Sequence, residues 1–226
     1  MASDADARIV GVIGASGQGK GVWLKGQILA EAPARLIVWD FMDEYGDTIK
    51  ALGGKDRKAP SLEAVRRAMI EAGEGPLLLR FVPRGAGQKM LMREFETLCE
   101  LVYAWGRCSF VAEELANVTT PSWAPASWRK MTTSGRHREV WIYGVTQSPA
   151  LVDKSFLGNC TLIHCCALRE HAHRVAVAKA MDISDAEIAT LIKFEYLEKD
   201  YETGQVTRES VTPPAKKPAK RAAKSP

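Results

Sequence analysis

The sequence predicts an α/β fold built on an open, mostly parallel sheet with helices on both faces. Apolar runs of strand length alternate with helix-like segments along most of the chain. The first strand-like run leads into a glycine-rich loop that opens a helix, and acidic or polar residues stand where later runs end. The 226 residues are enough to bury the core of one such domain.

The first third of the chain gives strand, helix and strand. RIVGVI, over 8–13, is a short β-rich apolar run. The segment 21–32 spaces its apolar residues as a helix does and stops before Pro33. RLIVWDF, over 35–41, is continuously apolar and ends in an acid, which is typical of a buried parallel strand.

The middle third repeats this alternation twice. A helix is expected over 61–73, because Ser61 suits its N-cap and a glycine ends it. Strands are expected over 75–82 and 108–115, on either side of a long amphipathic helix over 89–106. The second of these strands ends in two acids.

The last third completes the sheet. The stretch 116–138 mixes turn residues with a basic cluster and predicts no regular element. Two strands and then two helices follow, over 139–147, 160–168, 171–181 and 184–192. Ser184 and Glu187 have the spacing of a capping box. The segment 194–210 predicts an antiparallel hairpin that turns at Thr203-Gly204.

The positive charge of the chain is concentrated at its C-terminal end. The formal net charge is +4, but residues 212–226 contain five Lys or Arg residues and no acid, which leaves 1–211 at −1. The sequence therefore predicts a nearly neutral domain over 1–211 and a disordered Lys/Pro/Ala-rich tail over 212–226. Such a tail binds phosphates without sequence preference, or serves only as a solubilising end.

Cysteine usage and hydropathy indicate a soluble protein from a reducing compartment. The five cysteines form no C-x-x-C pair, so they are expected to be reduced apolar thiols. The acidic N-terminal segment MASDADARIV does not resemble a signal peptide. We also expect no transmembrane segment, because no apolar run approaches the length of a spanning helix.

The glycine-rich loop fits the phosphate-binding pattern G-x-x-x-x-G-K. Glycines let the backbone wrap with its N–H groups towards phosphate oxygens, and the helix behind the loop favours an anion at its N-terminus. A lysine then reaches the β and γ phosphates. The sequence therefore predicts an ATP site of the P-loop type, formed by Gly14, Ala15, Ser16, Gly17, Gln18, Gly19, Lys20 and Gly21.

One position departs from this pattern. Phosphate loops place a Ser or Thr after the lysine, and its hydroxyl binds Mg²⁺. Here the residue is Gly21, which has no side chain to offer. Either a water takes that coordination position or an acid elsewhere in the chain compensates.

Two carboxylates follow the strand CSFVA. We assign Glu113 to Mg²⁺, which prefers oxygen ligands, and Glu114 to the polarisation of the attacking water. The alternative is that both acids merely open a solvent-exposed loop. The upstream phosphate loop favours the catalytic interpretation.

The strand over 139–147 ends in Thr-Gln, and a basic segment precedes it. A polar amide at Gln147 suits a sensor beside the γ-phosphate. Arg136, in the segment SGRHR, could reach the nucleotide of a neighbouring subunit and stabilise the charge of the transition state. The alternatives for this segment are a solvated basic loop and a contact with DNA phosphates.

These motifs occur in an order that resembles the FtsK–HerA superfamily of DNA-pumping ATPases. The order is phosphate loop, strand-end acids, then Gly-Arg-His before a strand that closes with Thr-Gln. The segment Asp40-Phe41-Met42-Asp43-Glu44-Tyr45 is similar to the Asp-x-x-x-Glu-Tyr of HerA-like members. The resemblance covers about residues 8–168. In its small size, the chain most resembles the genome-packaging ATPases of tailless, membrane-containing icosahedral viruses.

The resemblance implies an activity, partners and residue roles. It implies ATP hydrolysis with Mg²⁺ by a ring, expected to be a hexamer, that pumps double-stranded DNA into a preformed capsid. The chain would then be found in the host cytoplasm and at the packaging vertex of the virion, where capsid vertex proteins are possible partners. Lys20 would bind phosphate, Glu114 would be the catalytic acid, Gln147 the sensor and Arg136 the arginine finger. Arg138 and Arg129 are second choices for the finger.

Other classes of protein share parts of this pattern. One is the assembly ATPase of filamentous phages, similar to zonular occludens toxin, which typically carries a transmembrane helix. A plasmid DNA-transfer ATPase usually has further domains. A small-molecule P-loop kinase usually has an arginine-rich lid, and a nucleotide-dependent scaffold that does not hydrolyse ATP would suit Gly21. Stimulation of ATP turnover by duplex DNA separates a DNA motor from a kinase.

Two tryptophans lie between the acidic pair and the basic segment. Trp123 and Trp128 stand among Pro and Ser residues. Burial under the loop is the first expectation for both. A subunit interface and stacking near DNA are the alternatives.

Overall fold

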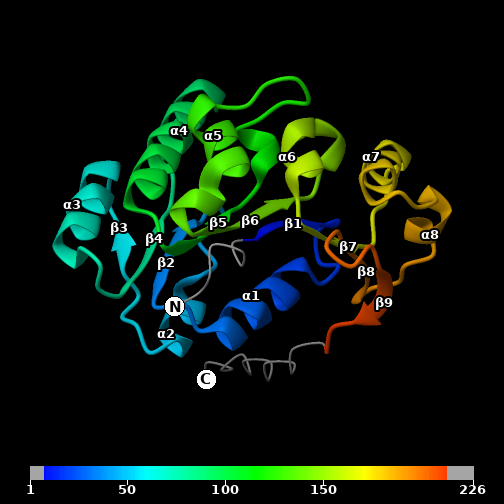
Figure 1. The fold of residues 1–226 in the computed structure, drawn as a ribbon, viewed down its shortest axis with the longest axis horizontal. Coiled ribbons are helices and arrows are strands. Elements are labelled where there is room, and N and C mark those ends of the chain that lie inside the picture. The colour runs from blue at the N-terminus through cyan, green and yellow to red at the C-terminus, as the bar shows by residue number, and fades with distance from the viewer. Residues whose placement is uncertain (1–7, 213–226) are drawn as a thin grey trace, which may run out of the picture.

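A nine-stranded sheet organises the fold in the computed structural model, which describes residues 8–212 (Figure 1). The strand order is β3-β4-β2-β5-β6-β1-β7-β8-β9. Strands β1 to β7 pair in parallel, and β8 and β9 add an antiparallel hairpin at one edge. The strands are β1 (Ile9–Ile13), β2 (Arg35–Trp39), β3 (Lys58–Ala59), β4 (Leu77–Phe81), β5 (Cys108–Ala112), β6 (Val140–Thr146), β7 (Leu162–Cys166), β8 (Glu195–Asp200) and β9 (Val206–Ser210).

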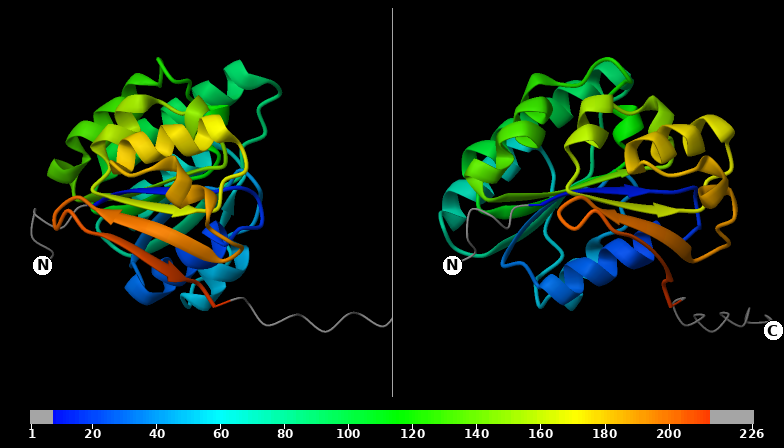
Figure 2. Two further views of the ribbon diagram at one scale, coloured as in Figure 1. Left: turned by 90° about the vertical axis from the view of Figure 1, so that its right-hand side faces the viewer. Right: turned by 45° about the vertical axis from the view of Figure 1, so that its right-hand side comes forward.

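Helices cover both faces of this sheet. Figures 1 and 2 show α1 and α2 on one face and the remaining α-helices on the other. The α-helices are α1 (Lys20–Glu31), α2 (Gly46–Ala51), α3 (Leu62–Ala72), α4 (Gln88–Trp105), α5 (Ala126–Ser134), α6 (Lys154–Asn159), α7 (His171–Met181) and α8 (Asp185–Ala189). Short 3-10 turns are η1 (Leu115–Asn117), η2 (Gly135–Arg138) and η3 (Pro149–Leu151).

The two faces bury separate apolar clusters. The larger cluster lies under α3 to α8 and includes Trp39, Phe95 and Trp128. The smaller one lies under α1 and includes Trp23. Strands that contribute to both clusters must be apolar on both sides, which explains the continuous apolar runs in the sequence. The fold class predicted from the sequence is confirmed.

Most predicted elements are present, and their caps are the predicted ones. Ser61 accepts a hydrogen bond from the backbone N–H of Ala64, and Ser184 forms the capping box with Glu187. The hairpin turns at Gly204, which has a φ of 72°. Four short elements were not predicted, namely α2, β3, α5 and α6.

The sheet order brings several strand ends together at one edge. β1 lies beside β6, β6 beside β5, and β5 beside β2, so the residues that follow these strands are neighbours at the carboxyl edge. The charged motifs do not all lie at this edge. The basic segment 134–138 precedes β6 and therefore lies at the amino edge of the sheet.

Two further predictions concern membrane-spanning segments and the C-terminal tail. Over residues 8–212, none of the helices combines the length and the hydropathy that a bilayer crossing requires. The predicted disordered tail lies outside the described residues, apart from Thr212.

Candidate nucleotide site at the carboxyl edge of the sheet

The phosphate loop joins β1 to α1, and its glycines are required by close contacts. Gly14 has a φ of 154°, and a Cβ added there would lie 2.6 Å from the Cβ of Cys166. The side chain of Lys20 folds back over the loop, where its Nζ donates hydrogen bonds to the carbonyl oxygens of Gly14 (2.6 Å) and Ala15 (3.2 Å). Burial lowers the pKa of Lys20. The amine thus lies against the backbone of the loop that is expected to bind phosphate.

Glu113 is buried at the end of β5, next to a tyrosine from another loop. The hydroxyl of Tyr45 donates a hydrogen bond of 3.0 Å to Oε1 of Glu113. Burial raises the pKa of Glu113 to about 7, although the Tyr45 hydrogen bond opposes this shift. The carboxyl group can therefore gain or lose a proton near neutral pH.

The loop after β2 holds Tyr45 in place through an ion pair with the neighbouring strand. Asp40 is fully buried and accepts hydrogen bonds from the backbone N–H groups of Glu44 (2.8 Å) and Tyr45 (3.1 Å). Arg80 on β4 donates to Asp40 at 3.0 Å and also pairs with Asp56. A buried carboxylate with three donors is well compensated, so this loop has a fixed conformation.

Glu114 and Gln147 meet across β5 and β6. Nε2 of Gln147 donates a hydrogen bond of 2.6 Å to Oε1 of Glu114. Glu114 has a φ of 51°, in the left-handed region that few non-glycine residues adopt. Residues in this conformation are often found at functional sites, and here the conformation accompanies the hydrogen bond between the Glu114 carboxylate and the Gln147 amide.

These residues line one cavity of about 930 Å³. Lys20, Glu113, Glu114 and Gln147 come from three different strand ends and share its wall. Further wall residues include Gly17, Gly19, Gly21, Lys25, Met42, Glu44, Asp47 and Phe194. The cavity is large enough for a nucleotide and has phosphate-binding groups on one side and carboxylates on the other.

The predicted arginine finger lies away from this cavity. Arg136 is exposed in η2, before β6, whereas Gln147 follows the same strand. A seven-residue strand separates the two by about 20 Å, so Arg136 cannot reach the cavity of its own chain. Within residues 8–212, its side chain forms no hydrogen bond or ion pair.

The two second-choice arginines have structural contacts. Arg138 donates hydrogen bonds to the carbonyl oxygens of Tyr103 (3.1 Å) and Ala104 (2.5 Å) at the end of α4. Arg129 donates to the carbonyl of Ser122 at 3.2 Å. Both therefore fix loops of their own chain, while Arg136 does not.

The two tryptophans differ. Trp128 is fully buried against Phe95 and Phe156, as expected. Trp123 is 44% exposed at a tight turn whose ends are joined by backbone hydrogen bonds between Thr120 and Trp123. The expectation that both are buried was therefore wrong for Trp123.

The oxygen-bearing side chains of the cavity are compatible with Mg²⁺, but the protein supplies few of the ligands that the ion needs. Residues 8–212 contain no cluster of three or more acidic, histidine or cysteine side chains arranged to hold a metal. Glu113 and Glu44 do line the cavity, as Gly21 does. Mg²⁺ in phosphate sites typically uses one or two carboxylates together with water and phosphate oxygens, which fits this arrangement.

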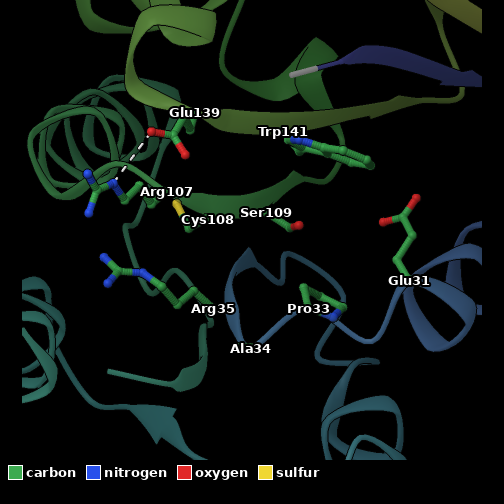
Figure 3. A pocket seen from close by; sticks show the side chains of 9 residues that line it. All are labelled: Glu31, Pro33, Ala34, Arg35, Arg107, Cys108, Ser109, Glu139 and Trp141. Carbon is green, nitrogen blue, oxygen red and sulfur yellow. Dashed lines mark ion pairs between the residues drawn. The ribbon is translucent and has the colours of Figure 1, made fainter. Parts of the chain in front are cut away.

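A second cavity lies at the opposite edge of the sheet (Figure 3). Its volume is about 270 Å³, and the ends of α1, β2, β5 and β6 form its wall. The charged groups around it are largely paired, since Arg107 lies 3.5 Å from Glu139 and Glu31 accepts from the hydroxyl of Tyr143. It lies at the amino edge, away from the phosphate loop.

Sequence reasoning missed several residues of the main cavity. Phe194, Glu44 and Asp47 line it, and Arg80 holds the loop that carries Glu44 through its ion pair with Asp40. Glu44 belongs to the segment Asp40-Phe41-Met42-Asp43-Glu44-Tyr45, from which no role was predicted for it. No local sequence pattern places Phe194 there, because it comes from a segment far along the chain.

The parallel sheet, the glycine-rich loop between β1 and α1, and the cavity at the carboxyl edge together identify the fold as that of a P-loop NTPase. No protein-family model matches the sequence. The chain is similar to Protein P9 of Pseudoalteromonas phage PM2, with 26% identity over 184 residues, which are 80% of this chain and 78% of that protein.

Solved structures share the fold over nearly the whole chain. One is the genome packaging NTPase B204 of Sulfolobus turreted icosahedral virus 2 in complex with AMPPCP, with a TM-score of 0.69 and 14% identity over 91% of this chain and 98% of that one. Another is VirB4 of Thermoanaerobacter pseudethanolicus, with a TM-score of 0.68 and 13% identity over 95% and 92%. The predicted resemblance to viral genome-packaging ATPases is thus confirmed for the fold.

Proposed function

We propose that this chain is an ATP-driven translocase that packages double-stranded viral DNA into a preformed capsid. The observation that carries the proposal is the cavity in which Lys20, Glu114 and Gln147 come together on a P-loop fold. Similarity to a phage protein and to a genome packaging NTPase supports the viral setting. The chain would act in the host cytoplasm and at the packaging vertex of the virion.

Each residue has a proposed role in hydrolysis. Lys20 and the backbone of residues 14–21 bind the triphosphate, and Glu114 orients and polarises the attacking water. Gln147, hydrogen-bonded to Glu114, senses the loss of the γ-phosphate. Glu113 helps to hold Mg²⁺, which when bound would neutralise charge on the phosphates.

The working unit is proposed to be a ring, with a hexamer as the expected form. Arg136 would enter the cavity of the neighbouring subunit and stabilise the transition state. Its exposure, and its distance from the cavity of its own chain, favour action between subunits. The basic tail would hold DNA phosphates, and capsid vertex proteins would anchor the ring.

Hydrolysis with and without duplex DNA tests this function. We expect linear duplex DNA to stimulate ATP turnover by the full chain, and Glu114→Gln to reduce turnover by about 100-fold or more while ATP still binds. Glu100→Gln, which changes an exposed glutamate on α4, is the matched control and should hydrolyse ATP normally.

Two results would refute this proposal. Turnover that survives in Glu114→Gln would remove the catalytic assignment. Turnover that duplex DNA leaves unchanged, across a series of salt concentrations, would favour a P-loop kinase or a scaffold over a DNA motor.

A further inference from the structure

We propose that Phe194 is the surface on which the base of the bound nucleotide stacks. This inference rests on the proposed function, because it assumes that a nucleoside triphosphate occupies the phosphate loop. It adds a contact that the phosphate-binding pattern does not contain.

Phe194 lies directly against the phosphate loop. Its backbone N–H donates a hydrogen bond of 3.1 Å to the carbonyl of Gln18. Its ring is so near Gly19 that a Cβ added to this glycine would lie 3.3 Å from Cδ1 of Phe194. The half-buried side chain lines the cavity together with Gly17 and Gly21.

The order of the strands puts this ring on the side of the loop opposite to the carboxylates. Phe194 immediately precedes β8, which lies beyond β7, whereas Glu113 and Glu114 follow β5. β1 and the phosphate loop lie between these two groups. A triphosphate with its last phosphate near Glu114 would therefore direct its ribose and base towards Phe194.

The backbone of Phe194 supports a functional role. Its φ is 72°, a conformation that is unfavourable for bulky side chains and that glycine would adopt without strain. The conformation is fixed on both sides, because the Phe194 carbonyl accepts a hydrogen bond of 2.9 Å from the N–H of Val211. Strain that the surroundings impose in this way is found at ligand clamps.

The ring provides the chemistry that a base requires. An aromatic side chain stacks on the π-face of any base, and such stacking is tolerant of base identity. Nζ of Lys193 lies 5.0 Å from the ring centroid of Phe194. Because Lys193 is exposed and its side chain is long, a base could displace its amine from the ring. The ligand class is thus a nucleoside triphosphate with an aromatic base.

A comparison of ATP with inorganic tripolyphosphate, which lacks ribose and base, tests the inference. Calorimetry on Phe194→Ala should show ATP affinity about tenfold lower than in the wild type, since stacking on one aromatic ring contributes about that factor. Tripolyphosphate affinity should be unchanged, which also demonstrates that the phosphate loop is intact. Phe194→Tyr should restore ATP binding.

Ile192→Ala is the matched control. Ile192 is 66% exposed, precedes Phe194 by two residues and does not line the cavity, so both ligands should bind this variant normally. Unchanged ATP affinity in Phe194→Ala, or an equal loss for both ligands, would overturn the inference and leave the proposed function standing. If the wild type bound neither ligand, the proposed function would fail and the inference with it.

Discussion

At the residue scale, the burial of Glu113 conflicts with its proposed role as a ligand of a cation. A carboxylate that binds a cation must be charged, yet burial opposes the charge and raises the pKa of Glu113 to about 7. The Tyr45 hydroxyl offsets part of this cost by donating to Oε1. Without a bound cation, the folded protein is therefore less stable when Glu113 is ionised, and a cation that binds there would favour the ionised form.

This conflict predicts a pH-dependent effect of Glu113→Gln on stability. The folded-state pKa of about 7 lies above the value of 4.5 expected for an exposed glutamate, so the folded protein loses stability as pH rises between these values. At pH 8 the substitution should raise the free energy of unfolding by up to about 3 kcal/mol, and near pH 4 by almost nothing. Urea unfolding without nucleotide or divalent cations measures both.

Glu100→Gln again provides the control, because Glu100 is exposed on α4. Its effect on stability should be small and the same at both pH values. An effect of Glu113→Gln that did not change between pH 4 and pH 8 would show that Glu113 does not titrate in this range.

Single residues of the site were predictable when a local pattern carried them. The glycines and Lys20 follow from loop geometry, and Glu114 and Gln147 follow from their positions at strand ends. Tyr45 and Phe194 could not be placed, because their contacts with Glu113 and Gly19 depend on how distant segments pack. No spacing along the chain encodes those contacts.

At the element scale, the first turn of α1 contains a residue that is unusual after the lysine of a phosphate-binding loop. Gly21 is exposed in its first turn, and a Cβ added there would meet nothing within 4 Å. Glycine in a helix also costs stability compared with a residue that has a side chain. The space for a hydroxyl exists, but the sequence does not use it.

Gly21→Ser should therefore strengthen the response to Mg²⁺. The serine hydroxyl would supply the ligand that phosphate loops normally provide, and one contact to a charged group of about 1.5 kcal/mol corresponds to about a tenfold lower Mg²⁺ requirement for ATP binding. Titration of ATP binding with Mg²⁺ measures this shift.

Gly158→Ser on α6 separates the metal effect from helix stabilisation. A Cβ at Gly158 also meets nothing within 4 Å, so this variant should gain similar helix stability without any change in Mg²⁺ dependence. An unchanged Mg²⁺ requirement in Gly21→Ser would indicate that the cation is held elsewhere.

Long elements with a clear period were predicted, whereas of the short helices only α8 was, because Ser184 and Glu187 mark its start. The helices α3 and α4 follow from their apolar spacing, and their starts and ends lie close to the predicted ones. In contrast, α2 and α6 have six residues each and β3 has two, which is too short for a period to be visible. α5 was hidden by its polar residues, although its buried side includes Trp128 and Met131.

At the scale of the whole molecule, the two edges of the sheet have different proposed tasks. The carboxyl edge carries the cavity, and the amino edge carries Arg136. One chain cannot bring these together, so if Arg136 acts as the proposed arginine finger, a complete site would need a second chain whose amino edge faces the first chain's cavity. A ring repeats this contact at every interface.

Arg136→Ala should consequently abolish turnover in the assembly but not nucleotide binding. An arginine finger contributes about 1,000-fold or more to the rate, so hydrolysis should fall by at least this factor. His137→Ala, which changes the exposed neighbour of Arg136, should retain turnover. ATP hydrolysis and ATP binding are measured on the same preparations.

Mixing experiments then distinguish action between subunits from action within one. In an equal mixture of Arg136→Ala and Glu114→Gln chains, about one quarter of the interfaces would join an intact Arg136 to an intact Glu114 if subunits mix at random. Partial recovery of turnover is therefore expected. Absence of recovery in mixed assemblies would contradict the role of Arg136 between subunits.

The burial of the native thiols makes this chain suitable for site-specific labelling. All five cysteines are buried and free, and burial raises the pKa of Cys108 and Cys166 to about 12. Alkylating dyes react with exposed thiolates, so the folded wild-type chain should remain almost unlabelled. A cysteine introduced at exposed His137 would then be the single reactive position, and energy transfer from a dye there could follow subunit approach without removal of any native cysteine.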